Sequence, residues 1–184
     1  MGLSTFAING QVDAATTHTV KSGESFWVIS KNYGVTVNSL MRLNGRTSSM
    51  LYVGERLQIP NSVSAWERDL LARLVHAEAK GEPYAGKVAV ATVVLNRVDS
   101  SLFPDTISGV INEKAYGYYA FSPVQNGTIK SAADTEAKHA VSEALAFRGQ
   151  GSGSLYFYNP RTAQSDWIKS RQATVTIGNH VFAK

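Results

Sequence analysis

The stretch His76-Ala77-Glu78-Ala79-Lys80-Gly81-Glu82-Pro83 places one carboxylate at the point where a helix must stop. If residues 66–80 are helical, the apolar residues three, four and seven positions before Glu78 share one helix face with it. These residues are Val75, Leu74 and Leu71. The spacing therefore predicts that Glu78 points toward the core or a cleft.

The residues after this helix predict its end and the state of the acid. Gly81 and Pro83 are typical helix-ending residues, so Glu78 lies near the negative end of the helix dipole. That position and partial desolvation both raise the pKa of Glu78, which makes it a candidate general acid for a glycosidic bond. Spacing alone equally allows an ordinary helix residue paired with Lys80 or Arg73.

The bulk properties narrow the choice of partner. A chain of 184 residues suits one medium domain plus a small module, or a single domain of unusual length. The formal charge of +4 suits an anionic partner, such as nucleic acid, a membrane surface or a bacterial wall rich in acidic polymers. The basic residues are dispersed, which disfavours nucleic acid. The absence of cysteine excludes disulfides and thiolate metal sites.

The N-terminal region lacks the features of a membrane anchor. No apolar segment approaches the roughly 20 residues needed to cross a bilayer, so we expect no membrane insertion. Residues 1–17 contain a short apolar run followed by small residues, but no charged or full hydrophobic region of a signal peptide. We expect them to form a flexible tail or the remnant of a secretory signal.

The pattern divides the chain into two blocks, with a linker predicted at residues 61–65. The first block, residues 18–60, predicts strand, helix, helix and strand, at 18–21, 25–33, 37–44 and 57–60. Gly34 is the expected C-cap of the first helix and Thr36 the expected N-cap of the second. A βααβ unit of this size is near the lower limit for independent folding.

The first block resembles a LysM module. The resemblance is carried by the segments 19–30, 33–35 and 53–60, together with Leu40 and Leu43-Asn44. It implies binding of glycans that contain N-acetylglucosamine, such as peptidoglycan or chitin, between the loop after the first strand and the loop before the last. The residues that this implies are Gly23, Glu24, Ser25 and Phe26 on one side and Ser49, Met50 and Leu51 on the other.

The second block, residues 66–184, predicts an α+β domain in which helices dominate. After the helix that carries Glu78 come a buried helix at 86–98, a short helix at 104–111 capped by Asp105, an aromatic loop at 116–123 and an amphipathic helix at 134–147. Segments 155–160 and 173–182 predict strands with a turn at Gly178-Asn179.

This block is similar to the spore cortex-lytic (SleB/CwlJ-type) cell wall hydrolases over nearly all of residues 66–184. The similarity is carried by 76–90, 94–98, 121–124, 157–160, 167 and 177–182. It implies a lysozyme-like fold, with the family's catalytic glutamate at Glu78. It also implies cleavage between N-acetylmuramic acid and N-acetylglucosamine, as a lytic transglycosylase that leaves a 1,6-anhydromuramic end.

The transglycosylase reaction needs one carboxylate, whereas ordinary hydrolysis generally needs a second. Glu82, Asp105, Asp134 and Asp166 are the possible second acids, although a turn, a helix cap or a solvated charge also explains each of them. Aromatic rings stack on sugars and amides bond acetamide groups. The residues expected to line the cleft on these grounds are Tyr119, Ser122, Tyr158, Asn159 and Trp167.

Other chemistry has little support in the sequence. The four histidines are dispersed, and no metal-ligand, phosphate-loop or serine-nucleophile motif is present, so we expect no metal and no cofactor. Three functions remain open: a lytic transglycosylase, a water-using muramidase, and a non-catalytic wall-binding or spore-structural protein. We expect a monomer that is secreted or associated with the wall or spore, acting on cortex or on vegetative wall.

Overall fold

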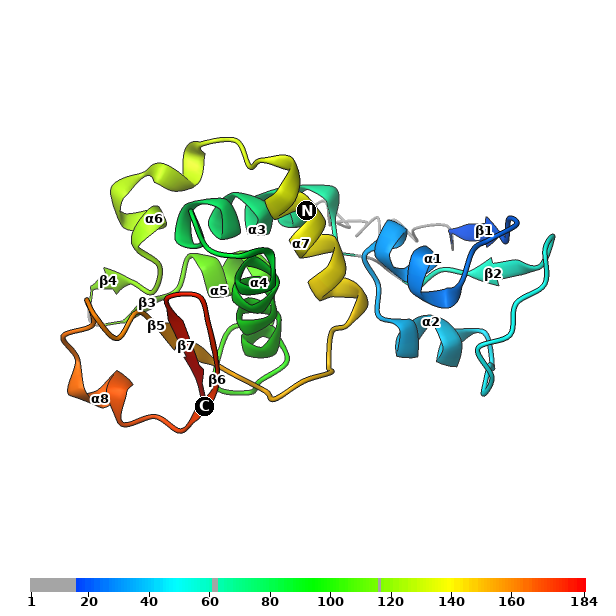
Figure 1. Cartoon of the computed structure of the whole chain (residues 1–184). Helices are drawn as coiled ribbons and strands as arrows, with labels where there is room; N and C mark the ends of the chain where they lie inside the picture. The colour runs from blue at the N-terminus through cyan, green and yellow to red at the C-terminus, as the bar shows by residue number, and fades with distance from the viewer. Residues whose placement is uncertain (1–15, 61–62, 116) are drawn as a thin grey trace, which may run out of the picture.

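The computed structural model describes residues 16–60, 63–115 and 117–184, which form an N-terminal module (16–60) and a C-terminal domain (63–184) (Figure 1). Nearly all of the predicted tail or signal remnant, and part of the predicted linker, lie outside the described residues. No helix in these described ranges is long and apolar enough to span a membrane.

The N-terminal module has the predicted βααβ order: β1 (Thr17–Thr19), α1 (Phe26–Tyr33), α2 (Val37–Leu43) and β2 (Arg56–Gln58). The two strands pair antiparallel, with His18 opposite Leu57. The sequence places polar residues at the helix ends: the Ser25 and Thr36 hydroxyls accept hydrogen bonds from the first turns of α1 and α2. The side chains that fill the core are Val20, Phe26, Ile29, Val35, Leu40, Leu57 and Ile59.

The C-terminal domain is mainly helical and carries small sheets, as predicted. Its helices are α3 (Ala65–Glu78), α4 (Tyr84–Val98), α5 (Ile107–Ile111), α6 (Ser122–Asn126), the 3-10 helix η1 (Thr128–Lys130), α7 (Thr135–Ala146) and α8 (Asp166–Lys169). Its strands are β3 (Lys114–Ala115), β4 (Tyr118–Tyr119), β5 (Tyr156–Tyr158), β6 (Ala173–Ile177) and β7 (His180–Ala183). β3 and β4 form a hairpin, and the other three make an antiparallel sheet in the order β5-β7-β6.

Helix α4 occupies the centre of the domain, packed against α3, α5 and α7 (Figure 1). Its almost continuous apolar sequence is explained by this position, since Val90, Val93 and Val94 are fully buried. Thr92 lies within this run, and its hydroxyl is satisfied locally because it donates to the Val88 carbonyl one turn back, 2.9 Å away.

The sequence misassigned several short elements. α5 begins at Ile107 and is capped by the Thr106 hydroxyl, so the prediction of Asp105 as its cap is wrong. The region expected to be an aromatic loop, 116–123, contains β4, which pairs with β3 just before it, and the start of α6. Helix α8 was not predicted. Such elements are too short to be stable by propensity alone and depend on tertiary contacts.

The β6–β7 turn is fixed to the loop that follows α3. The Glu82 carboxylate accepts hydrogen bonds from the Asn179 backbone N–H (2.9 Å) and side-chain amide (3.0 Å). A Cβ on Gly178, whose φ is 59°, would collide with the same carboxylate. Desolvation raises the pKa of Glu82, but the Asn179 bonds and nearby His180 outweigh it and the pKa is lowered.

We expect Glu82→Ala to lower the free energy of unfolding by about 1–2 kcal/mol, because two hydrogen bonds to a charged group that join distant segments are lost. Urea unfolding of the full chain at pH 7 measures this. Asp105→Ala removes an exposed acid and serves as the control, with an expected change within about 0.5 kcal/mol. Equal effects of the two substitutions would contradict the role of the Glu82 bonds.

Candidate active site

Glu78 is the last residue of α3, at the edge of the buried core. Leu71, Leu74 and Val75 are fully buried, as the helical spacing predicted, and Glu78 on the same face is partly buried. The helix stops there because Ala79 forms the C-cap and Gly81 adopts a left-handed φ of 80°.

Burial raises the pKa of Glu78 to about 7, while hydrogen bonds from the Ser122 hydroxyl and backbone N–H act in the opposite direction. Ser122 is the first residue of α6, which packs against α3. Two elements that are far apart in sequence therefore meet at this carboxyl group, and both of its protonation states are accessible near neutral pH.

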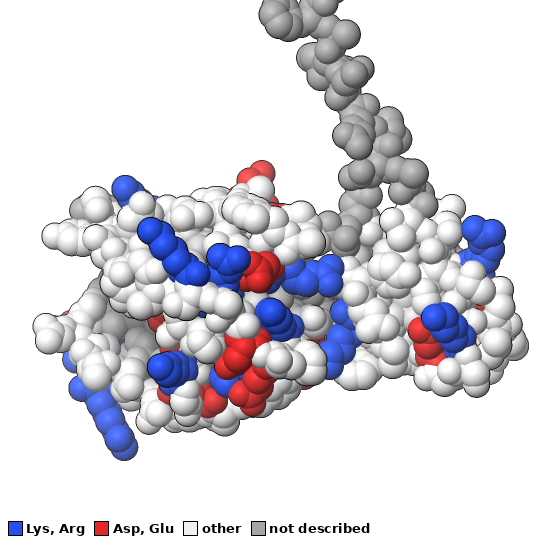
Figure 2. Space-filling model, turned by 90° about the horizontal axis from the view of Figure 1, so that it is seen from above, with Lys and Arg blue, Asp and Glu red and all other residues white. Residues whose placement is uncertain are grey.

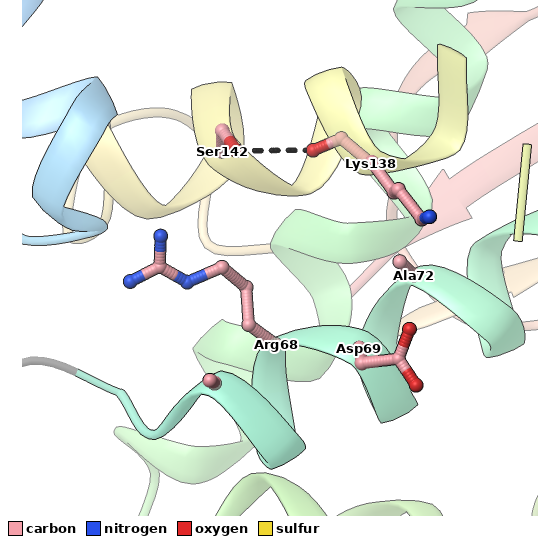
Figure 3. A pocket seen from close by; sticks show the side chains of 6 residues that line it. Arg68, Asp69, Ala72, Lys138 and Ser142 are labelled. Atoms are coloured by element: carbon pink, nitrogen blue, oxygen red, sulfur yellow. Dashed lines mark hydrogen bonds between the residues drawn. The ribbon is translucent and has the colours of Figure 1, made fainter. Parts of the chain in front are cut away.

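A hollow of about 290 Å³ lies between the end of α3 and α6, and it reaches Glu78 through Ser122, which lines the hollow and contacts the acid. The residues that line it are His76, Ala77, Lys80, Ser122, Pro123, Asn126, Thr128 and Ser131. A larger hollow of about 330 Å³ lies between α3 and α7, where Ser142 donates to the Lys138 carbonyl (Figure 3). Its α3 residues come from the start of that helix, so the smaller hollow is the better candidate site.

Two charged residues near the end of α3, Arg73 and Asp134, have other partners. Arg73 forms an ion pair with Asp69, which removes one of the partners that spacing allowed for Glu78. Asp134 accepts from the Ala137 N–H at 2.7 Å, as the predicted cap of α7, and pairs with His76 at 3.1 Å. These contacts lower the pKa of Asp134, the Ala137 bond having the largest effect. Figure 2 shows acidic and basic side chains mixed on this face.

The structure places the predicted cleft residues in different settings. Ser122 contacts Glu78 directly. Tyr119 is half-buried in β4, with the Lys114 ammonium 4.5 Å from its ring. Tyr158 ends β5, and the Asn159 side chain accepts from the Arg161 N–H at 2.9 Å within a turn.

Trp167 lies on α8 and is exposed. Its ring meets Tyr156 edge-on at 5.2 Å, and the Arg171 guanidinium lies 4.6 Å from its centre. This aromatic contact joins α8 to β5. Of the predicted cleft residues, Ser122 is therefore the one with a direct contact to the acid.

Arg97 and Phe121 support this arrangement and were missed as site residues. The buried Arg97 guanidinium lies 5.1 Å from the Phe121 ring, and its Nε donates to the Leu155 carbonyl at 2.7 Å. Phe121 also stacks on Phe157 of β5 and directly precedes Ser122. The sequence feature that could have identified Arg97 is its position as a single arginine near the end of an otherwise apolar helix.

The predicted glycan-binding residues of the N-terminal module divide into buried and exposed groups. Phe26 lies in the core, Ser25 caps α1, and Glu24 accepts from His18 and the Lys21 N–H. Gly23 makes the turn with a φ of 81°.

On the other side of the predicted groove, Ser49 and Met50 are exposed, and Leu51 is partly buried against the core. The Tyr52 hydroxyl, which sequence reasoning did not include, lies 3.2 Å from the Met50 sulfur. Tyr52 is itself exposed, so this side presents a larger apolar surface than the sequence predicted.

Neither remaining acid shares the setting of Glu78. Asp105 and Asp166 are exposed, and Asp166 lies in the first turn of α8. Among the residues that the structure describes, no three His, Cys, Asp or Glu side chains gather in a way that could hold a metal ion.

Comparisons with known proteins give the family. Residues 81–183 match the family described as Cell Wall Hydrolase, and residues 18–60 match the LysM domain. The first match begins three residues after Glu78, so it does not itself cover the acid.

Two curated relatives are spore cortex-lytic enzymes. The chain is 43% identical to that of Oceanobacillus iheyensis over 128 residues, which are 70% of this chain and 45% of the relative. It is 35% identical to that of Bacillus cereus over 177 residues, which are 96% of this chain and 67% of the relative. The chain thus spans less than half of the first relative and two thirds of the second.

A solved structure agrees with these matches. The catalytic domain of the germination-specific lytic transglycosylase SleB from Bacillus anthracis has a TM-score of 0.61 and 43% identity, covering 68% of this chain and 100% of that one. By sequence and by fold, the chain belongs to the cell wall hydrolase family, and a LysM domain precedes its hydrolase region.

Proposed function

We propose that this protein degrades peptidoglycan by cleaving between N-acetylmuramic acid and N-acetylglucosamine, as a lytic transglycosylase with Glu78 as its acid and base. The observation that carries the proposal is a partly buried carboxyl group, with its pKa raised to about 7, in contact with Ser122, which lines a hollow between two helices. The names of the relatives, spore cortex-lytic enzyme and lytic transglycosylase, support the same chemistry.

In the proposed reaction, protonated Glu78 donates its proton to the glycosidic oxygen that leaves as N-acetylglucosamine O4. The resulting carboxylate then accepts the proton of the muramic C6 hydroxyl, whose oxygen attacks C1 and closes the 1,6-anhydro ring. A pKa near 7 suits a group that must both give and take a proton. The Ser122 hydroxyl and N–H would stabilise the intermediate carboxylate.

The second candidate is a muramidase, in which water attacks with the help of another acid. Glu82 and Asp134 are bound to Asn179 and to the start of α7, which favours the mechanism with one acid. The third candidate is a binding protein without catalysis. Such a protein does not need an acid with a raised pKa, so it does not account for the setting of Glu78.

We propose peptidoglycan as the partner of both parts of the chain, with limits at 18–60 for the LysM module, 61–65 for the linker and 66–184 for the catalytic domain. Gly23, Glu24, Ser25, Phe26, Ser49, Met50 and Leu51 remain the proposed glycan-binding set of the module, and Tyr119, Ser122, Tyr158, Asn159 and Trp167 that of the cleft. The chemistry requires no cofactor. Secretion and association with the wall or spore follow from this substrate, and a monomer remains the proposed state.

We expect Glu78→Gln to lower the release of muropeptides by about 10²–10⁴-fold, because the amide cannot transfer the proton. The experiment incubates both proteins with purified cortex and with vegetative wall, and mass spectrometry identifies the products. Anhydro ends from the wild-type protein alone support the transglycosylase, and reducing ends would instead establish the muramidase. Equal release by both proteins would rule out Glu78 as the acid.

The rate should depend on pH through the same group. Because the pKa of Glu78 is about 7, kcat/KM toward soluble glycan strands should fall tenfold per pH unit above that value, as the acid loses its proton. A profile measured from pH 5 to 9 at constant ionic strength tests this. A rate that stays constant up to pH 9 would contradict the raised pKa of Glu78.

The raised pKa also predicts a stability effect that does not depend on catalysis. The unfolded chain ionises Glu78 near pH 4.5 and the folded chain near 7, so the ionised group destabilises the fold above pH 7 and has no effect below pH 4.5. Glu78→Gln should therefore raise the free energy of unfolding at pH 8 by up to about 3 kcal/mol. Urea unfolding at pH 4 and pH 8 measures the difference, and an equal change at both values would refute it.

A further inference from the structure

The N-terminal module rests against the start of α3 and the end of α7 (Figure 1). Arg68, near the start of α3, donates from Nη2 to the Tyr33 carbonyl, 2.9 Å away. Figure 3 shows the Arg68 side chain, which lines the α3–α7 hollow, extending toward the module. Tyr33 ends α1, where carbonyl groups lack partners within the helix and the dipole is negative, so a guanidinium cation is well suited to this position.

Gly34 makes this contact possible. It is the C-cap of α1 with a φ of 63°, and a Cβ built on it would lie 2.6 Å from Nη2 and 2.7 Å from Cζ of Arg68. The glycine therefore meets two requirements at once: a left-handed backbone and room for a side chain from the other part of the chain. Gly45, which follows α2 with a φ of 62°, has open space around its Cβ position.

An aromatic contact lies in the same interface. The Trp27 ring of α1 lies 6.4 Å from the Phe147 ring at the end of α7. Each residue keeps 39% of its surface exposed, and the Lys31 ammonium lies 5.1 Å from the Trp27 ring. A pair of aromatic rings contributes about 0.5–1.5 kcal/mol beyond the area that it buries.

The short connection between the two parts strengthens this modest interface. Pro60 and Ala65 are five residues apart, so their Cα atoms can separate by at most about 18 Å. Such a tether gives an effective concentration in the mM range, which populates contacts that would be weak between separate molecules.

The interface also sets the distance between the module and Glu78. Arg68 and Glu78 lie on one uninterrupted helix, ten residues apart, which corresponds to about 15 Å along its axis. The segments between β1 and α1 and between α2 and β2, which hold all of the proposed glycan-binding residues except Phe26, lie on the side of the module away from α3 and α7 (Figure 1). A strand that reaches both sites must therefore extend along the whole interface.

We infer that the module is docked on α3 and α7 as one body with the catalytic domain, and that the preferred substrate is a glycan strand long enough to occupy the module and the Glu78 cleft together. The substrate part of this inference depends on the function proposed above. The docking part depends only on the contacts.

Two glycine variants form a matched pair for the test. Gly34→Ala and Gly45→Ala both place a side chain on a left-handed backbone after a helix of the module, so they share the same conformational cost. Only in Gly34→Ala would the added Cβ collide with the Arg68 side chain. Arg68→Gln, made in the other part of the chain, disrupts the same contact without changing the module.

NMR relaxation of backbone amides in the full 184-residue chain tests the docking. We expect one rotational correlation time for both parts in the wild-type protein and in Gly45→Ala. The module should tumble faster than the catalytic domain in Gly34→Ala and Arg68→Gln. A module that already tumbles independently in the wild-type protein would overturn the inference.

Turnover of fractionated glycan strands and of tetrasaccharides from the same wall tests the substrate. The wild-type protein and Gly45→Ala should show a kcat/KM at least about 10-fold higher on long strands than on tetrasaccharides. Gly34→Ala and Arg68→Gln should lose this preference, while their rates on tetrasaccharides stay unchanged. The same preference in all four proteins would overturn the substrate part. A wild-type protein inactive on both substrates would refute the proposed function, and the relaxation result would still decide docking.

Discussion

Burial of one face of α3 is the constraint on which the C-terminal domain depends. Leu71, Leu74 and Val75 are fully excluded from water, and truncating one such leucine typically costs 2–5 kcal/mol. Because side chains three, four and seven residues apart share a helix face, this burial also turns Glu78 inward. The packing that stabilises the domain therefore also orients the Glu78 side chain.

This packing also places the Glu78 carboxyl group where burial disfavours its ionised form. The nearby carboxylates show the contrast, since hydrogen bonds from Asn179 and from the start of α7 outweigh desolvation at Glu82 and Asp134 and lower their pKa values. Environments that separate the pKa values of neighbouring acids also separate their roles. Two of these acids stabilise the fold as anions, and the third can hold or release its proton near neutral pH.

The accuracy of the sequence analysis followed the length of each element. The long helices α3, α4 and α7, the caps at Thr36 and Gly34, and the Gly178-Asn179 turn were predicted from periodicity and local side-chain chemistry. The short helices α6 and α8 were not, because a single turn has little intrinsic stability and forms where neighbouring segments hold it. α8, for example, depends on the contact between Trp167 and Tyr156.

The sequence by itself determined the helix that carries Glu78, the face on which it lies and the division of the chain into two parts, because these depend on spacing between near neighbours. Only the tertiary structure decided that Ser122 meets Glu78, that Asn179 holds Glu82, and that Arg68 reaches Tyr33. Each of these pairs joins residues that are 35 or more positions apart. Their meeting depends on how whole helices and strands pack, which local periodicity does not encode.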